Sequence, residues 1–484
     1  MMNQPVTKNF IGGQFTNGQD KMMDVLSPID GTVLSKVVIS SKGDLDQAVQ
    51  HAQGALASWS QQTLKERVQV FYNFRSLLQR DMEELAELVH LENGKVINEA
   101  RAEVAKGIEL TEFACSLPQF IQDEVQEVSK GIECRTMHVP VGIVASITPF
   151  NFPAMVPLWT IPNALALGNC MIIKPSEKTP MTVNKIASLL QEAGLPDGVF
   201  NVIQGDKDIV EAICDHPDIE AVSFVGSTKI AKLVYKRATG NLKRCMAMGG
   251  AKNHLIVLPD AHPEMAKNII ASMAGCAGQR CMAASAMVAV GETDKIIDMM
   301  CQEAQSWVVG QNLGTVISQE AKERIESYIT EAESLGAKVI IDGRNTTVAG
   351  KEGGFYVGVT IIDDVTPDMK IAQEEVFGPV LAIMRTNDID DAIAIENASS
   401  YGNASSVYTQ NGSLAKYVTE RVSAGMVGVN VGVPVPREPF SFGGWNESRF
   451  GVNDITGKSS IPFWTKIKKQ TTKWNPEDWK DWMS

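Results

Sequence analysis

The residue with the clearest capacity for covalent chemistry is Cys281, which ends the sequence Gly-Gln-Arg-Cys. A thiolate is a strong nucleophile, and a helix start or a neighbouring cation such as Arg280 can lower the pKa of a cysteine from its usual value of about 8.5. Residues 282–288 are small and apolar, which predicts a buried helix that would hold this thiol in place. Buried cysteines are commonly inert, and from these residues alone that interpretation is favoured.

Two further groups have suitable side chains for a reaction site. Asn151 lies between aromatic and proline residues in Pro-Phe-Asn-Phe-Pro, and its amide could donate a hydrogen bond to a developing oxyanion; a turn-forming asparagine is the equally weighted alternative. Glu374 and Glu375 precede Val-Phe-Gly-Pro, and a solvated acidic turn is the alternative there.

Two strand ends are candidates for nucleotide binding. The apolar run 170–173 ends in Lys174-Pro-Ser-Glu177, where a lysine and a glutamate could contact the hydroxyls of a ribose; a solvated loop is the alternative. The run 221–225 leads into Gly-Ser227-Thr and a helix, and a helix N-terminus can bind an anion. The second segment lacks G-x-G-x-x-G, so a simple helix cap explains it equally well.

The elements that must position these residues belong to a protein of several domains. A chain of 484 residues exceeds the size of one hydrophobic core, so two or three domains are expected. The net charge of −13 argues against nucleic-acid binding, which requires a basic surface. The eight cysteines and six histidines are dispersed, so we expect no metal site and free thiols in a reducing cytoplasm.

No segment predicts insertion into a membrane. Residues 139–173 carry no charge and are long enough to span a bilayer, but they contain five prolines and several glycines and asparagines. That composition predicts buried strand, turn and short helix around a site. Residues 1–15 lack the apolar core of a signal peptide, so we expect a soluble cytoplasmic protein.

The order of predicted elements indicates an α/β fold. Residues 7–40 predict short strands, and helices are predicted at 44–58, 63–79, 82–91 and 96–115. Lys106 lies off the apolar stripe of the last helix, where a solvated charge is expected from the pattern alone. After a hairpin at 125–139, strands and helices alternate, first over residues 141–239 and again over 254–409. This alternation predicts parallel sheets that bind ligands at the carboxyl ends of their strands.

Taken in order, the motifs resemble those of the aldehyde dehydrogenase superfamily over nearly the whole chain. They are TPFNFP (148–153), KPSE (174–177), FVGST (224–228), GGAKNH (249–254), GQRCMA (278–283), EEVFGPV (374–380) and SFGGW (441–445). Within the superfamily the chain is most similar to the CoA-acylating methylmalonate-semialdehyde dehydrogenase branch. Particular pointers are GAKNH, GQRCMA, GVNVGVP at 428–434 and FWT at 463–465.

The resemblance implies a division of the chain and a set of residue roles. It implies a Rossmann-type NAD-binding domain (1–119 and 139–248), an α/β catalytic domain (249–445) and a small β oligomerisation element (120–138 and 446–484). Cys281 matches the nucleophile, and Asn151 matches the oxyanion-hole amide. The positions that match cofactor contacts are Thr148, Phe150, Lys174, Glu177, Lys178, Ser227, Gly249, Glu375 and Phe377. Glu177 on a ribose favours NAD over NADP, since a 2′-phosphate would meet a carboxylate.

Two departures from the superfamily pattern refine the expected reaction. Met248 stands where most members carry the glutamate that activates water, and methionine cannot accept a proton, so coenzyme A becomes the expected acyl acceptor. In the branch, two arginines grip the substrate carboxylate; here the positions hold Arg280 and Lys106. Lysine lacks the bidentate fork of arginine, so it could hold a carboxylate less firmly or favour another anion.

The expected reaction is therefore NAD-dependent oxidation of a short acidic aldehyde, of the methylmalonate or malonate semialdehyde type, through a Cys281 thioester. A hydrolytic semialdehyde dehydrogenase whose base lies elsewhere remains an alternative. A non-catalytic dinucleotide-binding or structural protein is a more remote one. The resemblance also implies a homo-oligomer, either a dimer or a tetramer.

Overall fold

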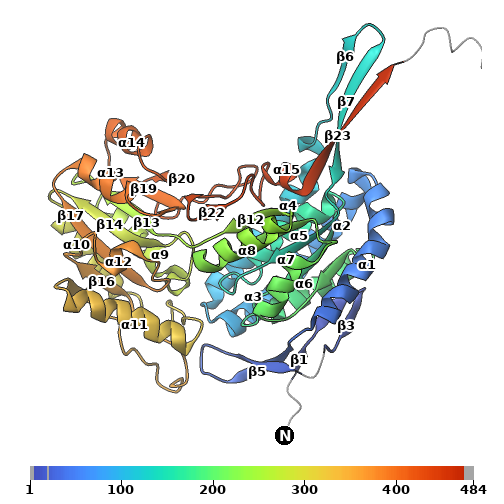
Figure 1. The fold of residues 1–484 in the computed structure, drawn as a ribbon. Coiled ribbons are helices and arrows are strands. Elements are labelled where there is room, and N and C mark those ends of the chain that lie inside the picture. Colours follow the sequence, from blue (N-terminus) through green and yellow to red (C-terminus); the bar gives the residue numbers. More distant parts are fainter. Residues whose placement is uncertain (1–4, 19–20, 474–484) are drawn as a thin grey trace, which may run out of the picture.

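The computed structural model describes residues 5–18 and 21–473, which form two large lobes and a narrow projecting arm (Figure 1). Each lobe is built on one sheet with its own helices, and each has its own cluster of buried apolar side chains. The α/β fold with parallel sheets expected from the sequence is present. The residue limits of the three predicted domains stay a prediction.

The first sheet has eight strands in the order β22-β12-β11-β8-β9-β10-β2-β3. Its five central strands, β12 to β10 in this order, run parallel to one another, so their carboxyl ends share one edge. The strand bounds are β2 (Asn9–Ile11), β3 (Gln14–Thr16), β8 (Ile143–Ile147), β9 (Cys170–Lys174), β10 (Phe200–Val202), β11 (Ala221–Val225), β12 (Arg244–Met248) and β22 (Arg449–Phe450).

The helices of this lobe begin where the sequence provides caps. Ser41 and Asp44 form a capping box at the start of α1, and Thr63 and Glu66 form another at α2. The apolar stripe predicted for residues 96–115 is buried in α4, which continues five residues further. The helices are α1 (Lys42–Gln61), α2 (Leu64–Arg80), α3 (Met82–Asn93), α4 (Ile97–Phe120), α5 (Met155–Ala166), α6 (Met181–Glu192), α7 (Lys207–Asp215) and α8 (Thr228–Gly240).

The second sheet has seven strands in the order β15-β16-β17-β14-β13-β19-β20. All neighbouring pairs are parallel except β15 with β16. The strands are β13 (Asn253–Val257), β14 (Ala284–Val290), β15 (Lys338–Ile341), β16 (Thr360–Asp363), β17 (Val380–Thr386), β19 (Ala404–Tyr408) and β20 (Met426–Val429). The helices are α9 (Met265–Ala274), α10 (Asp294–Ala304), α11 (Gln319–Ser334), α12 (Lys370–Gln373), α13 (Ile389–Asn397) and α14 (Gly412–Thr419), with a short 3₁₀ turn, η1, at Gly275–Gly278.

The prediction of a buried helix at residues 282–288 is wrong. Cys281 lies in a turn, and the apolar run after it forms β14, which pairs with β13 on one side and β17 on the other. A central strand of a parallel sheet is covered on both faces, so its sequence is continuously apolar and lacks the alternation that would mark a strand. The thiol is therefore held at the start of a strand.

The arm consists of β6 (Val125–Ser129), β7 (Ile132–Pro140) and β23 (Thr465–Lys473), and it extends away from both lobes (Figure 1). The hairpin predicted at residues 125–139 is present, and the chain returns through α15 (Ser460–Trp464) to pair β23 with β7. Residues 474–484, the end of the predicted oligomerisation element, lie outside the described residues.

The smaller strands complete the described chain. The strands β1 (Val6–Thr7), β4 (Met22–Leu26) and β5 (Val33–Val38) form a three-stranded sheet, and β18 (Tyr401–Gly402) pairs with β21 (Trp445–Asn446). A search of the described residues finds no helix with the length and apolar character needed to cross a membrane.

Candidate active site

The parallel strands of the first sheet bring four predicted cofactor positions to one edge. Thr148 follows β8, Lys174 ends β9, Ser227 follows β11 and Gly249 follows β12. The backbone N–H of Thr148 donates to the carbonyl of Lys174 at 3.0 Å, so the first two positions are direct neighbours. This is the edge at which open parallel sheets bind ligands.

Lys174 and Glu177 are arranged to bind a diol. The buried Lys174 ammonium donates to Oε2 of Glu177 at 2.9 Å. Burial works to raise the pKa of Glu177, but the charge of Lys174 outweighs it and holds that pKa below its ordinary value. Glu177 is therefore an ionised acceptor beside a donor. The adjacent Lys178 bonds Ser176 Oγ through its backbone N–H at 3.2 Å, and no described side-chain contact joins Lys178 to this pair.

Glu375 reaches this edge from the second lobe. Its carboxylate accepts a hydrogen bond from the backbone N–H of Ala251 at 3.0 Å, directly after the glycines that follow β12. Burial raises the pKa of Glu375 to about 7. A Cβ on Gly250 would collide with this carboxylate, and one on Gly249 would come within 2.7 Å of the Glu447 carbonyl, so the glycines allow the close approach.

Phe150 and Phe377 also join the two lobes. Their rings meet edge to face with centroids 5.9 Å apart. Phe377 adopts a φ of +54°, a conformation that few residues with bulky side chains adopt. Strain of this kind clusters at binding sites, where the surrounding structure enforces it.

The two candidate reaction residues lie on adjoining loops. Asn151 is buried, and its Nδ2 donates to the carbonyl of Gln279 at 3.0 Å, two residues before Cys281. This bond uses one amide hydrogen and leaves the other available to an oxyanion. Before Gln279, the η1 residues Cys276 and Ala277 both have positive φ, so a strained left-handed turn presents the Cys281 loop.

A buried ion pair between Lys95 and Glu103 holds the Asn151 loop in place. Lys95 Nζ donates to Glu103 Oε2 at 2.5 Å and to the backbone carbonyl of Asn151 at 2.8 Å. The other oxygen of Glu103 accepts the backbone N–H groups of Ala154 and Met155, at the start of α5. The pair therefore supplies the cap that α5 lacks in its own sequence and holds Asn151 against that helix.

The short segment 92–95, which contains Lys95, also connects the cofactor edge with the Cys281 loop. Glu92 accepts the backbone N–H groups of Met181 and Thr182 at the start of α6, and Asn93 donates to the Phe150 carbonyl. The Gly94 carbonyl accepts the N–H of Thr315, whose own carbonyl accepts a bond from the Gln279 side chain. The sequence pattern did not predict this connecting role, because Glu-Asn-Gly-Lys is typical of an ordinary helix C-terminus.

Cys281 opens onto a cavity of about 660 Å³. Both predicted substrate residues, Lys106 and Arg280, line the same cavity, so the structure brings them together with the thiol. The wall also includes apolar side chains from α5 and from residues 431–442, among them Trp159, Val433 and Phe442. Lys106 is consequently not the solvated charge that its position off the apolar stripe suggested.

Arg280 lowers the pKa of Cys281, as expected, but its influence is outweighed. Burial is the largest influence and raises this pKa, Glu375 acts in the same direction, and the net pKa of the thiol is about 12. The expected helix start is wrong, because Cys281 lies in a turn before β14. The neutral thiol is therefore favoured at physiological pH in the protein alone.

Met248 is buried at the end of β12, immediately before Gly249. Its thioether stands at the strand-end position that matches the water-activating glutamate of the superfamily pattern, and a thioether cannot take up a proton.

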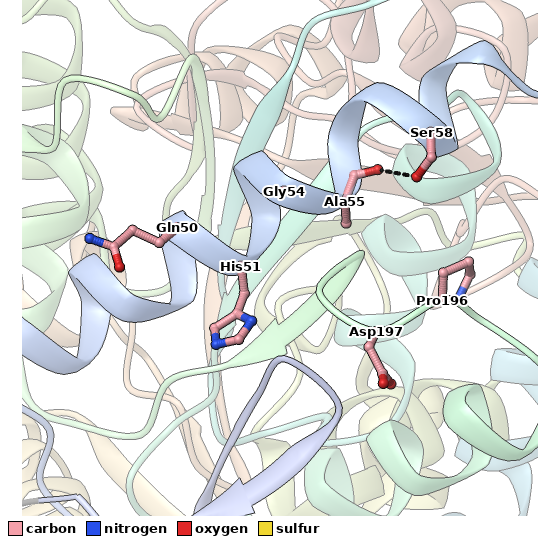
Figure 2. Close-up of a pocket in the computed structure, with 7 residues that line it drawn as sticks. All are labelled: Gln50, His51, Gly54, Ala55, Ser58, Pro196 and Asp197. Atoms are coloured by element: carbon pink, nitrogen blue, oxygen red, sulfur yellow. Dashed lines mark hydrogen bonds between the residues drawn. The ribbon is translucent and has the colours of Figure 1, made fainter.

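A second hollow of about 470 Å³ lies between α1 and the loop at Pro196–Asp197 (Figure 2). His51 and Asp197 project toward it, while Ser58 bonds the Ala55 carbonyl within the helix (Figure 2). None of the predicted site residues lines this hollow, so it is separate from the Cys281 cavity.

The chain is similar to known proteins over nearly its whole length. The model of the aldehyde dehydrogenase family matches residues 15–470. The chain belongs to the aldehyde dehydrogenase family. It is 43% identical over 479 residues to malonate-semialdehyde dehydrogenase 1 of Geobacillus kaustophilus, covering 97% of this chain and 98% of that protein.

Two solved structures are also similar to this aldehyde dehydrogenase. A putative methylmalonate-semialdehyde dehydrogenase from Sinorhizobium meliloti, complexed with NAD, matches with a TM-score of 0.96 and 41% identity, covering 98% of this chain and 99% of that chain. The methylmalonate-semialdehyde dehydrogenase of Oceanimonas doudoroffii matches with a TM-score of 0.97 and 40% identity, covering 99% and 100%.

Replacing Lys95 by Met should destabilise the protein by about 3–5 kcal/mol, because Glu103 would be left as an unpaired buried charge. Urea unfolding followed by tryptophan fluorescence measures this. Arg101→Met, on the helix that carries Glu103, is the control; it breaks an exposed pair with Glu83 and should cost less than about 1 kcal/mol. Equal losses in the two variants would contradict a supporting role for the buried pair.

The rate at which iodoacetamide alkylates Cys281 in the protein without cofactor should rise about tenfold per pH unit from pH 7 to 10. The pKa of about 12 lies above this range, so the thiolate fraction grows throughout it. Mass spectrometry of the Cys281 peptide gives the rate, and Cys281→Ala corrects for the other thiols. A plateau below pH 9 would contradict the raised pKa.

Proposed function

We propose that this NAD-dependent aldehyde dehydrogenase oxidises a short aldehyde that carries a carboxylate, of the malonate or methylmalonate semialdehyde type, and transfers the acyl group to coenzyme A. One observation carries the proposal: the Cys281 thiol lines one cavity with the cationic side chains of Lys106 and Arg280, and the Asn151 amide is hydrogen-bonded to the loop that carries the thiol. The names of the similar proteins support the substrate type.

The residues at the sheet edge fit NAD. The ionised Glu177 beside Lys174 suits the two hydroxyls of a ribose and disfavours a 2′-phosphate. Ser227 is the N-cap of α8, whose first backbone N–H groups are suited to a pyrophosphate, and the Glu375 carboxylate at the same edge is suited to a second ribose. When bound, NAD supplies the acceptor for a hydride.

The chain's own groups supply the remaining chemistry. The Cys281 sulfur adds to the aldehyde carbon, and the free hydrogen of the Asn151 amide donates to the oxygen as it becomes negative. The bond from Asn151 to Gln279 fixes that amide relative to the nucleophile's loop. Loss of the hydride leaves the acyl group on Cys281 as a thioester.

The buried Met248 supports a thiol acceptor for that thioester. A water molecule needs a base to become a competent nucleophile, whereas coenzyme A provides a thiol that ionises far more readily. The hydrolytic alternative requires a base from another position.

We also propose that the enzyme is a cytoplasmic homo-oligomer. The nine-residue strand β23 has β7 on one side only among the described residues, and an open strand edge of this length favours pairing with another copy. None of the eight cysteines forms a disulfide, which suits a reducing compartment.

Replacing Cys281 by Ala should abolish NADH formation and leave NAD binding unchanged within about twofold, because the thiol takes part in the covalent step only. Steady-state absorbance at 340 nm and calorimetric titration with NAD measure the two properties. Cys276→Ala, which changes another thiol of the same cavity, is the control and should retain turnover. Turnover by Cys281→Ala would exclude the thioester.

NADH formation from malonate semialdehyde should depend on coenzyme A. With it, we expect sustained turnover; without it, one equivalent of NADH per active site forms, followed by a steady rate at least about tenfold lower, because Met248 provides no base. Stopped-flow absorbance resolves the burst. A steady rate that is indifferent to coenzyme A would favour the hydrolytic alternative, and the absence of any NADH would favour a non-catalytic protein.

A further inference from the structure

Lys106 is not a free cation in the Cys281 cavity. Its ammonium lies 2.7 Å from Oε2 of Glu438 and 3.0 Å from Oε2 of Glu109. The side chains of Lys106 and Glu438 are 22% and 13% exposed, so this pair is only weakly screened, while Glu109 is 47% exposed. Two carboxylates thus share one ammonium.

Arg280 differs from Lys106 in this respect. Across residues 5–18 and 21–473, no ion pair joins Arg280 to a carboxylate, and its guanidinium donates to the backbone carbonyls of Ala271 and Ser272. Its Nε is buried without a hydrogen-bond partner. Of the two predicted carboxylate-binding cations, Arg280 therefore has spare hydrogen-bonding capacity and Lys106 is already paired.

The other charged residues that line the Cys281 cavity also disfavour a substrate carboxylate at Lys106. The carboxylates that line the cavity are Glu99, Glu103, Glu109 and Glu438, and the cations are Lys106, Arg280 and Arg437. Lys95 balances Glu103, and Arg437 lies 3.9 Å from Glu109 with an exposed side chain. A substrate carboxylate that approaches Lys106 must consequently approach Glu438 as well, and like charges at such separations repel.

We infer that Glu438 is a specificity-determining residue. Its carboxylate pairs with Lys106 and so occupies the position that the carboxylate of an acidic aldehyde would take. A substrate acid reaches Lys106 only by displacing Glu438, so this enzyme discriminates between acidic and neutral aldehydes less strongly than a free Lys106 would allow. This inference rests on the proposed function and deepens it, since it identifies the internal competitor of the substrate.

The position of Glu438 in the chain suits this role. It belongs to the segment between β20 and β21, whose Val431, Val433 and Val435 also line the cavity, while Lys106 lies on α4 of the other lobe. The pair therefore spans the cavity wall. If Glu438 had a purely structural role, its replacement would lower kcat/KM by the same factor for every aldehyde and leave the aldehyde preference unchanged. A change in that preference therefore separates the two interpretations.

The first test is the ratio of kcat/KM for malonate semialdehyde to kcat/KM for propanal, measured with NAD and coenzyme A. Glu438→Gln keeps the shape and a hydrogen bond to Lys106 but removes the competing charge, so the ratio should rise roughly tenfold. Glu109→Gln changes the more exposed partner and should raise it by no more than about threefold. Glu112→Gln, on the same helix but paired with Arg75, is the matched control and should leave the ratio unchanged.

A double variant tests whether the effect operates through Lys106. In Lys106→Ala/Glu438→Gln, the gain seen with Glu438→Gln alone should disappear, because the freed ammonium is then absent. A ratio that Glu438→Gln leaves unchanged or lowers would overturn the inference. So would a double variant that retains the full gain, since the carboxylate would then bind elsewhere.

A binding measurement tests the role of Glu438 in a variant that does not turn over. In the Cys281→Ala background, malonate is an unreactive probe with the same carboxylate, and calorimetry should show its Kd falling roughly tenfold when Glu438→Gln is added. An unchanged Kd would overturn the inference. Absence of NADH from the wild-type enzyme with both aldehydes would refute the proposed function alone, since the malonate titration still tests Glu438.

Discussion

The buried ion pair of Lys95 and Glu103 is the interaction on which the geometry of the site depends. Removing two charges from water is costly, and a protein recovers that cost only when every remaining hydrogen-bonding group is satisfied. Here the partners are backbone atoms of the site itself: the Asn151 carbonyl and the first N–H groups of α5. The electrostatic requirement of the pair therefore fixes the oxyanion loop.

The same burial that makes this pair rigid suppresses the reactivity of the thiol. Cys281 is partly buried where it lines the cavity, and burial and the charge of Glu375 both favour its neutral form. The protein alone therefore holds the nucleophile in its less reactive form.

The sequence predicts the fold and most of the site residues because short motifs mark the strand ends. Thr148, Lys174, Ser227 and Gly249 come together because parallel strands share an edge, a rule that needs no coordinates, whereas Glu375 reaches that edge from the second lobe. The helix at residues 282–288 was predicted wrongly because apolar periodicity cannot distinguish a central strand from a buried helix. The segment 92–95 was missed because its partners lie far away in the sequence, and Glu438 was missed because nothing local shows that it faces Lys106.

Met248 and the Lys106–Glu438 pair have a common physical consequence. Met248 removes a charge from the deacylation side of the site, and Glu438 neutralises one on the substrate side. The cavity wall still carries four carboxylates and three cations, so the charge that is lost is local to Lys106 and to the end of β12. Under the proposed function, Arg280 is then the main remaining cation for the substrate acid, because its guanidinium donates to backbone carbonyls and, among the described residues, pairs with no carboxylate.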